Sequence, residues 1–214
     1  MGLNTSKFES LTGATDLRFP EYDDPPAGPT DLVRSWLDRA VELEVREPLA
    51  LALATADGRG RPSTRIVAVV TIDDDGLLFT THSTSRKSRE IAETGWASGL
   101  FYWRETGQQI SLNGPVTAVP EGRSDALWAA RPVPLHAMSA ASRQSEPLTD
   151  PVALQTRAEQ LAATGAALPR PERYVGYQLR LDEVEFWCAR SDRLHHRLVY
   201  RRVGDIWHVT RLQP

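Results

Sequence analysis

The feature that most constrains the fold of this chain is a succession of short apolar segments separated by turn sequences. Segments 49–56 and 63–71 flank the turn Asp57-Gly58-Arg59-Gly60, a pattern that predicts an antiparallel hairpin. A second turn, at residues 73–76, leads into another short strand at 77–81. Because tight turns join antiparallel neighbours, we expect a meander of antiparallel strands here.

The rest of the chain continues this pattern and adds a few helices. Further strands are expected at 97–103, 109–119, 174–187, 197–202 and 206–212. Helices are expected at 32–41 after a cap at Thr30 or Asp31, at 85–94 before Gly95, at 121–130 and at 150–164. We therefore predict a mostly β protein with flanking helices, in which six or seven largely antiparallel strands form a closed or half-closed barrel.

The N-terminal residues have a different composition. Acidic side chains and prolines crowd residues 16–29, and no apolar periodicity is present. We expect a flexible N-terminal segment over residues 1–29 and one domain over residues 30–214.

Charge and cysteine content exclude several classes of protein. The 25 Lys and Arg residues against 28 Asp and Glu residues give a net charge of -3, which argues against a nucleic-acid-binding protein. No apolar stretch approaches the roughly 18 to 20 residues that span a bilayer, so we expect no membrane partner. Cys188 is the only cysteine and cannot form an internal disulfide, which favours the reducing cytoplasm.

Arginine supplies almost all of the positive charge, with only Lys7 and Lys87 as lysines. Genome composition could explain the excess, or some arginines could serve as planar, two-pronged partners for carboxylates or phosphates. Motifs for dinucleotide binding, for a nucleotide phosphate loop, for a serine nucleophile and for a paired-histidine metal site are absent from the sequence, and no metal site is expected.

A first group of cations lies at the start of the helix expected at 85–94. Arg86 and Lys87 occupy its first turn, where the helix dipole disfavours positive charge and where main-chain N–H groups attract anions. With the hydroxyls of Thr80 and Thr81, and with Arg65 from the neighbouring strand, they could form a phosphate-binding cradle. The alternative is an ordinary solvated helix start.

A second group follows the aromatic residue Trp187. Arg193, His195 and Arg197 surround a turn that could bind an anionic substrate beside a group that titrates near neutral pH. Trp187 offers a flat surface for a ring. A single histidine in a turn, such as the adjacent His196, is more often a surface residue.

At these residues the sequence resembles the pyridoxamine 5'-phosphate oxidase family, from about residue 31 to residue 214. The resemblance is carried by short segments in a fixed order: 65–67, 76–81 with 85–87, 100–103 with Gln109, 131–132, 142–145, 185–187, 193–197 and 211–212. It implies an FMN-binding split β-barrel that works as a homodimer, with FMN near the interface.

The resemblance also implies site residues. The FMN contacts of the family match Arg65, Ile66, Val67, Thr80, Thr81, Arg86, Lys87, Gln109, Gln144, Ser145, Trp187 and Arg197. Its substrate contacts match Arg131, Arg193, Leu194 and His195, and Arg193 and His195 are expected to be the catalytic residues beside the reacting carbon.

Three positions depart from the family pattern for binding a substrate phosphate. Its lysine, tyrosine and serine fall on Val70, Leu127 and Leu135, which enlarge the apolar wall of the substrate site. Losing these partners makes a vitamin B6 phosphate a poor substrate. With segments 46–52, 60–65 and 141–146, this resembles the phenazine-biosynthetic branch of the family.

That branch implies oxidation of a reduced tricyclic phenazine carboxylate, with dioxygen as electron acceptor. The alternatives are a pyridoxamine 5'-phosphate oxidase and a non-catalytic flavin- or haem-binding split barrel.

Overall fold

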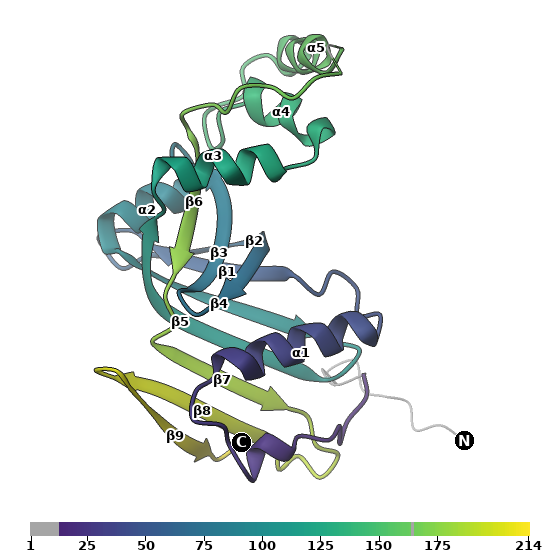
Figure 1. The fold of residues 1–214 in the computed structure, drawn as a ribbon, viewed down its shortest axis with the longest axis vertical. Helices are drawn as coiled ribbons and strands as arrows, with labels where there is room; N and C mark the ends of the chain where they lie inside the picture. The colour runs from purple at the N-terminus through teal and green to yellow at the C-terminus, as the bar shows by residue number, and fades with distance from the viewer. Residues whose placement is uncertain (1–12, 164) are drawn as a thin grey trace.

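The computed structural model describes residues 13–163 and 165–214. Within these residues, six antiparallel strands close a barrel in the order β4, β1, β2, β3, β6, β5 (Figure 1). Their bounds are Ala50–Ala56 (β1), Pro62–Asp73 (β2), Gly76–His82 (β3), Trp96–Trp103 (β4), Gln108–Ala118 (β5) and Tyr174–Leu179 (β6). The ring closes because β4 pairs with β5 as well as with β1. The prediction of a mostly β barrel with flanking helices is confirmed.

Three more strands extend this sheet beyond the barrel. Strands β7 (Glu183–Cys188), β8 (His196–Val203) and β9 (Ile206–Leu212) form a meander that pairs with β5 through β7. The described residues therefore contain nine strands, of which six form the barrel; the predicted number of six or seven fits the barrel but is too low for the whole sheet.

The single strand predicted at 174–187 is also wrong, because the chain turns a corner at residues 180–182. Arg180 N–H donates to Pro115 O and Asp182 N–H donates to Asn113 O, while Leu181 enters the core. A Cβ at Gly114 would lie 1.8 Å from Arg180 O, so glycine permits this close crossing. The long strand β5 thus pairs with β6 in the barrel and with β7 in the extension.

The core is built from buried side chains of helix α1 (Thr30–Glu42) and of the strands. Helix α1 lies across the strands and buries most of its apolar stripe, including Trp36. Val41, predicted to join that stripe, is 56% exposed, and the N-cap position is Pro29 instead of Thr30 or Asp31. Inside the barrel and its extension, buried side chains such as Leu53 and Phe186 alternate with more exposed ones.

The remaining helices were predicted in part. Helices α2 (Arg86–Thr94), α3 (Glu121–Ala130) and α5 (Pro151–Ala162) are confirmed, with Gly95 in the left-handed conformation after α2 and the Asp150 side chain capping α5. The short helix α4 (His136–Ala141) and the 3-10 turns Pro20–Tyr22 and Val133–Leu135 were missed.

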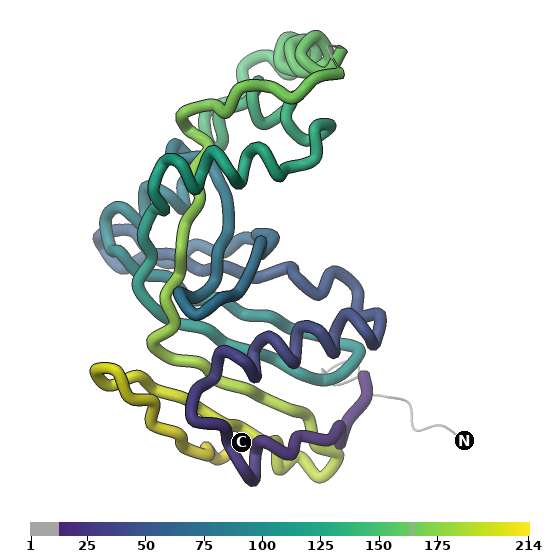
Figure 2. The backbone as a smooth tube through the Cα atoms, in the orientation of Figure 1, coloured from purple at the N-terminus to yellow at the C-terminus, as the bar shows by residue number. Residues whose placement is uncertain are grey.

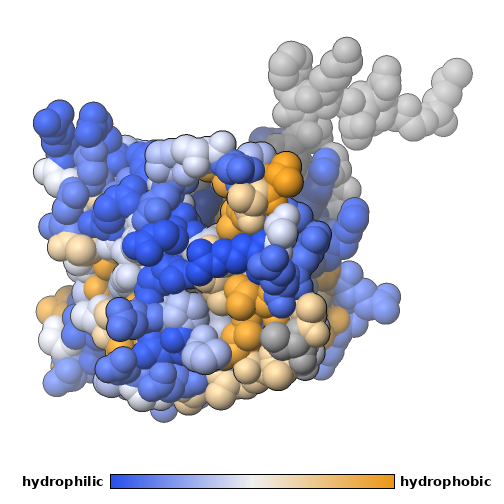
Figure 3. All heavy atoms as spheres, turned by 90° about the horizontal axis from the view of Figure 1, so that it is seen from above, coloured by the Kyte–Doolittle hydropathy of each residue, from blue (hydrophilic) through white to orange (hydrophobic). Residues whose placement is uncertain are grey.

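Helices α3, α4 and α5 gather at one end of the molecule, beyond the β3–β6 side of the barrel (Figures 1 and 2). A view onto this end shows apolar side chains gathered among hydrophilic ones (Figure 3). Among the described residues, no helix is long and apolar enough to cross a membrane. The cytoplasmic location stays a prediction.

Residues 13–29, which belong to the predicted N-terminal segment, lie against α1, β7 and β8. Phe19 is buried and packs edge-on against Trp36 at 4.9 Å, and Tyr22 stacks on His196 at 4.1 Å. Residues 1–12 of that segment lie outside the described residues. The flexibility of the segment and the domain boundary at residue 30 stay predictions.

Candidate active site

The cations predicted to form a phosphate cradle converge at the start of α2. Ser85 caps the helix by accepting a hydrogen bond from Ser88 N–H, and Arg86 and Lys87 follow it. Lys87 Nζ donates to Thr81 Oγ1 on β3 at 2.9 Å. Arg65 reaches the same place from β2, which pairs with β3. The structure thus brings Arg65, Arg86, Lys87 and Thr81 together, and the half-buried Thr80 precedes them on β3.

The residue that joins the two arginines is Glu90, which the sequence analysis missed. One carboxylate oxygen accepts from Arg86 Nε at 2.7 Å, and the other accepts from Ser63 Oγ at 2.6 Å and lies 3.3 Å from Arg65 Nη2. Burial alone would raise the pKa of Glu90, but hydrogen bonds led by those from Ser63 and Thr55 lower it to about 2. Glu90 therefore stays ionised and holds both guanidinium groups.

The loop after α4 joins the cradle, as the resemblance implies. Ser145 Oγ accepts from Arg86 N–H at 3.0 Å, and Gln144 Oε1 accepts from Thr81 Oγ1 at 2.9 Å. Ser145 is in the left-handed region with φ 67°. Gln144 N–H donates to Nδ1 of the buried His82 at 3.3 Å, a second residue that the sequence analysis missed.

His82 is neutral in this environment. Burial, together with the nearby charges of Arg173, Lys87 and Arg131, lowers the pKa of His82 to about 4. The neutral ring leaves Nδ1 able to accept the Gln144 N–H, so the charge state of His82 is coupled to the position of the 144–145 loop.

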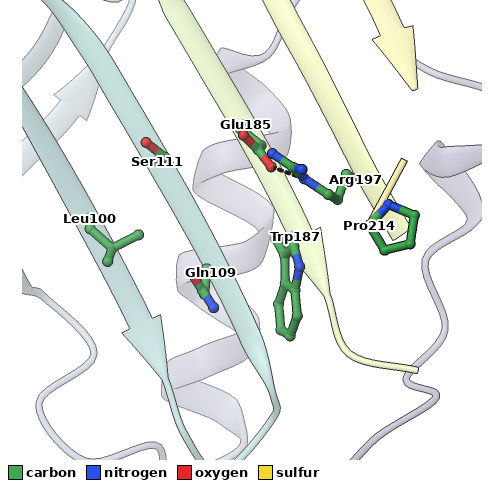
Figure 4. Close-up of a pocket in the computed structure, with 7 residues that line it drawn as sticks. All are labelled: Leu100, Gln109, Ser111, Glu185, Trp187, Arg197 and Pro214. Atoms are coloured by element: carbon green, nitrogen blue, oxygen red, sulfur yellow. Dashed lines mark hydrogen bonds and ion pairs between the residues drawn. The ribbon is translucent and has the colours of Figure 1, made fainter. Parts of the chain in front are cut away.

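A second group of predicted residues lines a pocket of about 370 Å³ on β4, β5, β7 and β8, within the roughly 300 to 1,000 Å³ usual for small-molecule sites. Figure 4 shows its seven lining residues: Leu100, Gln109, Ser111, Glu185, Trp187, Arg197 and Pro214. Gln109 and Arg197 lie opposite Trp187 on the neighbouring strands. Arg197 Nε donates to Glu185 at 2.6 Å, which fixes the guanidinium beside the indole.

The turn between β7 and β8 lies beside this pocket. Arg193 has φ 65° and Leu194 is 63% exposed. The His195 ring lies 4.7 Å from Trp187, and its Nδ1 accepts from Arg190 N–H at 3.1 Å. Because a main-chain N–H only donates, the proton of a neutral His195 is on Nε2. His196 is half-buried, and its ring stacks on Tyr22.

Arg131, at the end of α3, does not line the Trp187 pocket, and neither do the cradle residues. Val70 and Leu135 are each 50% exposed, and Leu127 is half-buried next to Gly176. The Ile66 side chain is 64% exposed, whereas the Val67 side chain faces the core. Within the described residues, one chain therefore carries two separate parts of the predicted site.

Comparison with known proteins gives two matches to family models along this chain. The family model for pyridoxamine 5'-phosphate oxidase matches residues 37–188, and the model for the pyridoxine 5'-phosphate oxidase C-terminal dimerisation region matches residues 174–214. The chain belongs to the pyridoxamine 5'-phosphate oxidase family. In this family's terms, β6 to β9 are the dimerisation region, and the fold is that of a homodimeric split barrel.

Within the pyridoxamine 5'-phosphate oxidase family, the relatives differ in similarity. A dihydrophenazinedicarboxylate synthase from Burkholderia lata is 58% identical and aligns over 99% of this chain and 100% of its own length. A pyridoxine/pyridoxamine 5'-phosphate oxidase from Paraburkholderia phymatum is 40% identical over 92% of this chain and 93% of its own length. The resemblance to the phenazine branch is confirmed.

A solved structure agrees with the fold. PhzG from Burkholderia lata, in complex with tetrahydrophenazine-1-carboxylic acid, superposes with a TM-score of 0.93 at 57% identity, covering 94% of this chain and 100% of that one.

Proposed function

We propose that this protein is an FMN-dependent oxidase of phenazine biosynthesis, acting on a reduced tricyclic phenazine carboxylate with dioxygen as electron acceptor. The observation that carries the proposal is the replacement of phosphate partners by Val70, Leu127 and Leu135 while Arg131 and Arg193 remain. Such a wall suits an apolar ring system, and the arginines suit its carboxylates. The phenazine-related names of the similar proteins support the same substrate class.

The donor set fits FMN. Arg65, Arg86, Lys87 and the N-terminus of α2 would neutralise its phosphate, with Gln144 and Ser145 beside them. Gln109, Trp187 and Arg197 would contribute from the second group, across a homodimer that joins the two parts of the site. When bound, FMN would accept a hydride from the reduced ring and deliver two electrons to dioxygen, giving hydrogen peroxide.

The protein's own residues would bind and orient the substrate. Arg131 and Arg193 would pair with its carboxylates, while Val70, Leu127 and Leu135 exclude water from the reacting face. His195, with its proton on Nε2, would donate a hydrogen bond to the substrate; in its neutral form it is not a base at that atom.

The test is anaerobic mixing of the FMN-loaded protein with a reduced phenazine-1,6-dicarboxylate while flavin absorbance is followed. We expect rapid bleaching, and recovery of the absorbance on admission of oxygen. Pyridoxamine 5'-phosphate is the control substrate and should bleach the flavin far more slowly. Equal rates for the two compounds would refute the substrate assignment, and a protein that binds no FMN would refute the oxidase assignment.

A further inference from the structure

A buried histidine outside the groups described above lies directly behind Arg131. His136 begins α4 and is 1% exposed. Its Nε2 lies 3.0 Å from Arg131 O, and its Nδ1 accepts from Leu168 N–H at 3.2 Å. Because Leu168 N–H can only donate, the neutral ring must carry its proton on Nε2 and donate to the Arg131 carbonyl.

Aromatic packing fixes the ring of His136 in place. The ring stacks on Trp128 with centroids 4.2 Å apart, and Trp128 Nε1–H donates to Leu168 O at 2.6 Å. Trp128 also meets the Tyr174 ring edge-on at 4.8 Å. His136 is thus held by two hydrogen bonds and a stack, an arrangement that leaves its ring little freedom to move.

His136 and Trp128 also hold the main chain of Arg131. Arg131 N–H donates to Trp128 O at 3.1 Å, and Arg131 has the extended conformation that a following proline, Pro132, favours. With its carbonyl held by His136, both main-chain polar groups of Arg131 are bonded. Its guanidinium carbon lies 5.7 Å over the Tyr174 ring, so the side chain leaves a fixed backbone along an aromatic surface.

We infer that His136 is a positioning residue that holds Arg131 in the orientation that receives a substrate carboxylate. The inference rests on the proposed function, which assigns a carboxylate to Arg131. His136 itself is sealed from solvent and acts only through the Arg131 carbonyl. The pairing of a guanidinium with a carboxylate depends on geometry, so a shifted Arg131 backbone weakens carboxylate binding without touching the flavin.

Two amide substitutions separate this role from simple packing. The side chain of H136N can still accept from Leu168 N–H but is too short to reach Arg131 O, whereas H136Q can place an N–H group near the position of Nε2. Both substitutions remove the stack on Trp128, so the difference between them reports the bond to Arg131. If either variant does not fold, H136F is compared with the parent protein instead, because the phenyl ring preserves the stack on Trp128 and removes both hydrogen bonds.

The measurement is equilibrium binding of phenazine-1,6-dicarboxylate to the FMN-loaded variants, followed by flavin absorbance, with unsubstituted phenazine as the control ligand. We expect H136N to raise the Kd of the dicarboxylate by about tenfold. This is the loss expected when one hydrogen bond between the Arg131 guanidinium and the ligand carboxylate is weakened. H136Q should stay within about threefold of the parent protein. The Kd of unsubstituted phenazine and that of FMN should not change.

A double-mutant cycle with Arg131→Ala completes the test. In the R131A background, H136N or H136F should have no further effect on dicarboxylate binding. If R131A alone leaves the Kd unchanged, the proposed role of Arg131 is wrong. If R131A weakens binding but the His136 variants do not, or if they weaken phenazine and the dicarboxylate equally, the positioning role of His136 is overturned.

Discussion

Some residues of the candidate site can be recognised from the sequence, and others cannot. Arg86 and Lys87 could be found because two cations at a helix start conflict with the helix dipole. Glu90 could not, because a glutamate four residues after an arginine is the ordinary pattern of an exposed helix pair. Only the packing of α2 against β1 buries the Glu90 carboxylate, while the Arg86 side chain stays exposed.

Substitution of Glu90 tests its role in the cradle. E90Q would leave Arg65 and Arg86 without their shared anion, and breaking a buried ion pair costs about 3 to 5 kcal/mol. Because Arg86 is partly exposed, we expect about half of that loss in the free energy of unfolding, together with weaker FMN binding. Urea unfolding and quenching of flavin fluorescence measure the two effects. E42Q, on the exposed face of α1, is the control, and equal behaviour of both variants would contradict the role.

His82 predicts a pH dependence. Its folded pKa of about 4 is below the ordinary value of 6.5, so the unfolded chain binds an extra proton between these values. The contribution of neutral His82 to stability is therefore complete above pH 6.5 and is lost as the pH falls toward 4. We expect the free energy of unfolding to decrease from pH 6.5 to pH 5, with a shallower decrease in H82N. Parallel slopes for the two proteins would show that His82 is not the group.

At the scale of elements, the sequence predicted the features that depend on residues close together in the chain. The hairpin β1–β2, the Gly95 stop of α2 and the Asp150 cap of α5 are all set by residues close in sequence. The corner at residues 180–182 is not, because its hydrogen bonds go to β5 residues more than sixty positions earlier. Helix α4 was missed because its six residues are too few to show a helical period.

The close approach of Arg180 to β5 predicts that Gly114 cannot be replaced without loss of stability. G114A would place a Cβ against the Arg180 carbonyl oxygen, and we expect it to destabilise the protein by about 3 kcal/mol or more. Gly122 on α3 has no neighbouring atom within 4 Å of such a Cβ, so G122A should instead stabilise by about 0.5 kcal/mol. Urea unfolding of both variants checks the difference, and similar stabilities would contradict the close approach.

At the scale of the whole molecule, the two parts of the candidate site lie apart on one continuous sheet. Residue patterns and the resemblance together supplied the residues of both parts, but only the structure separates the cradle at α2 from the Trp187 pocket. We expect the dimer to present the cradle of one protomer to the pocket of the other, and two-fold symmetry would then give two equivalent sites.

Mixed dimers test this arrangement. R86A and R197A should each lower FMN affinity as homodimers, since each removes a cation from every site. Co-expression with different tags gives hybrid dimers, in which one site carries both substitutions and the other carries neither. The purified hybrid should therefore bind FMN with parental affinity at half of its sites, as measured by flavin titration. A hybrid without any tight site would place both arginines in the same protomer's site.

The position of β6 in the barrel has a consequence for how the protein is made. Strand β6 lies between β3 and β5, yet it follows β5 by more than fifty residues, which include α3, α4 and α5. While the ribosome is still translating those helices, β3 and the end of β5 are unpaired edges, of the kind that template aggregation. The barrel can close only when residues 174–179 have left the exit tunnel, so nearly the whole chain must be synthesised before its first cooperative unit is complete.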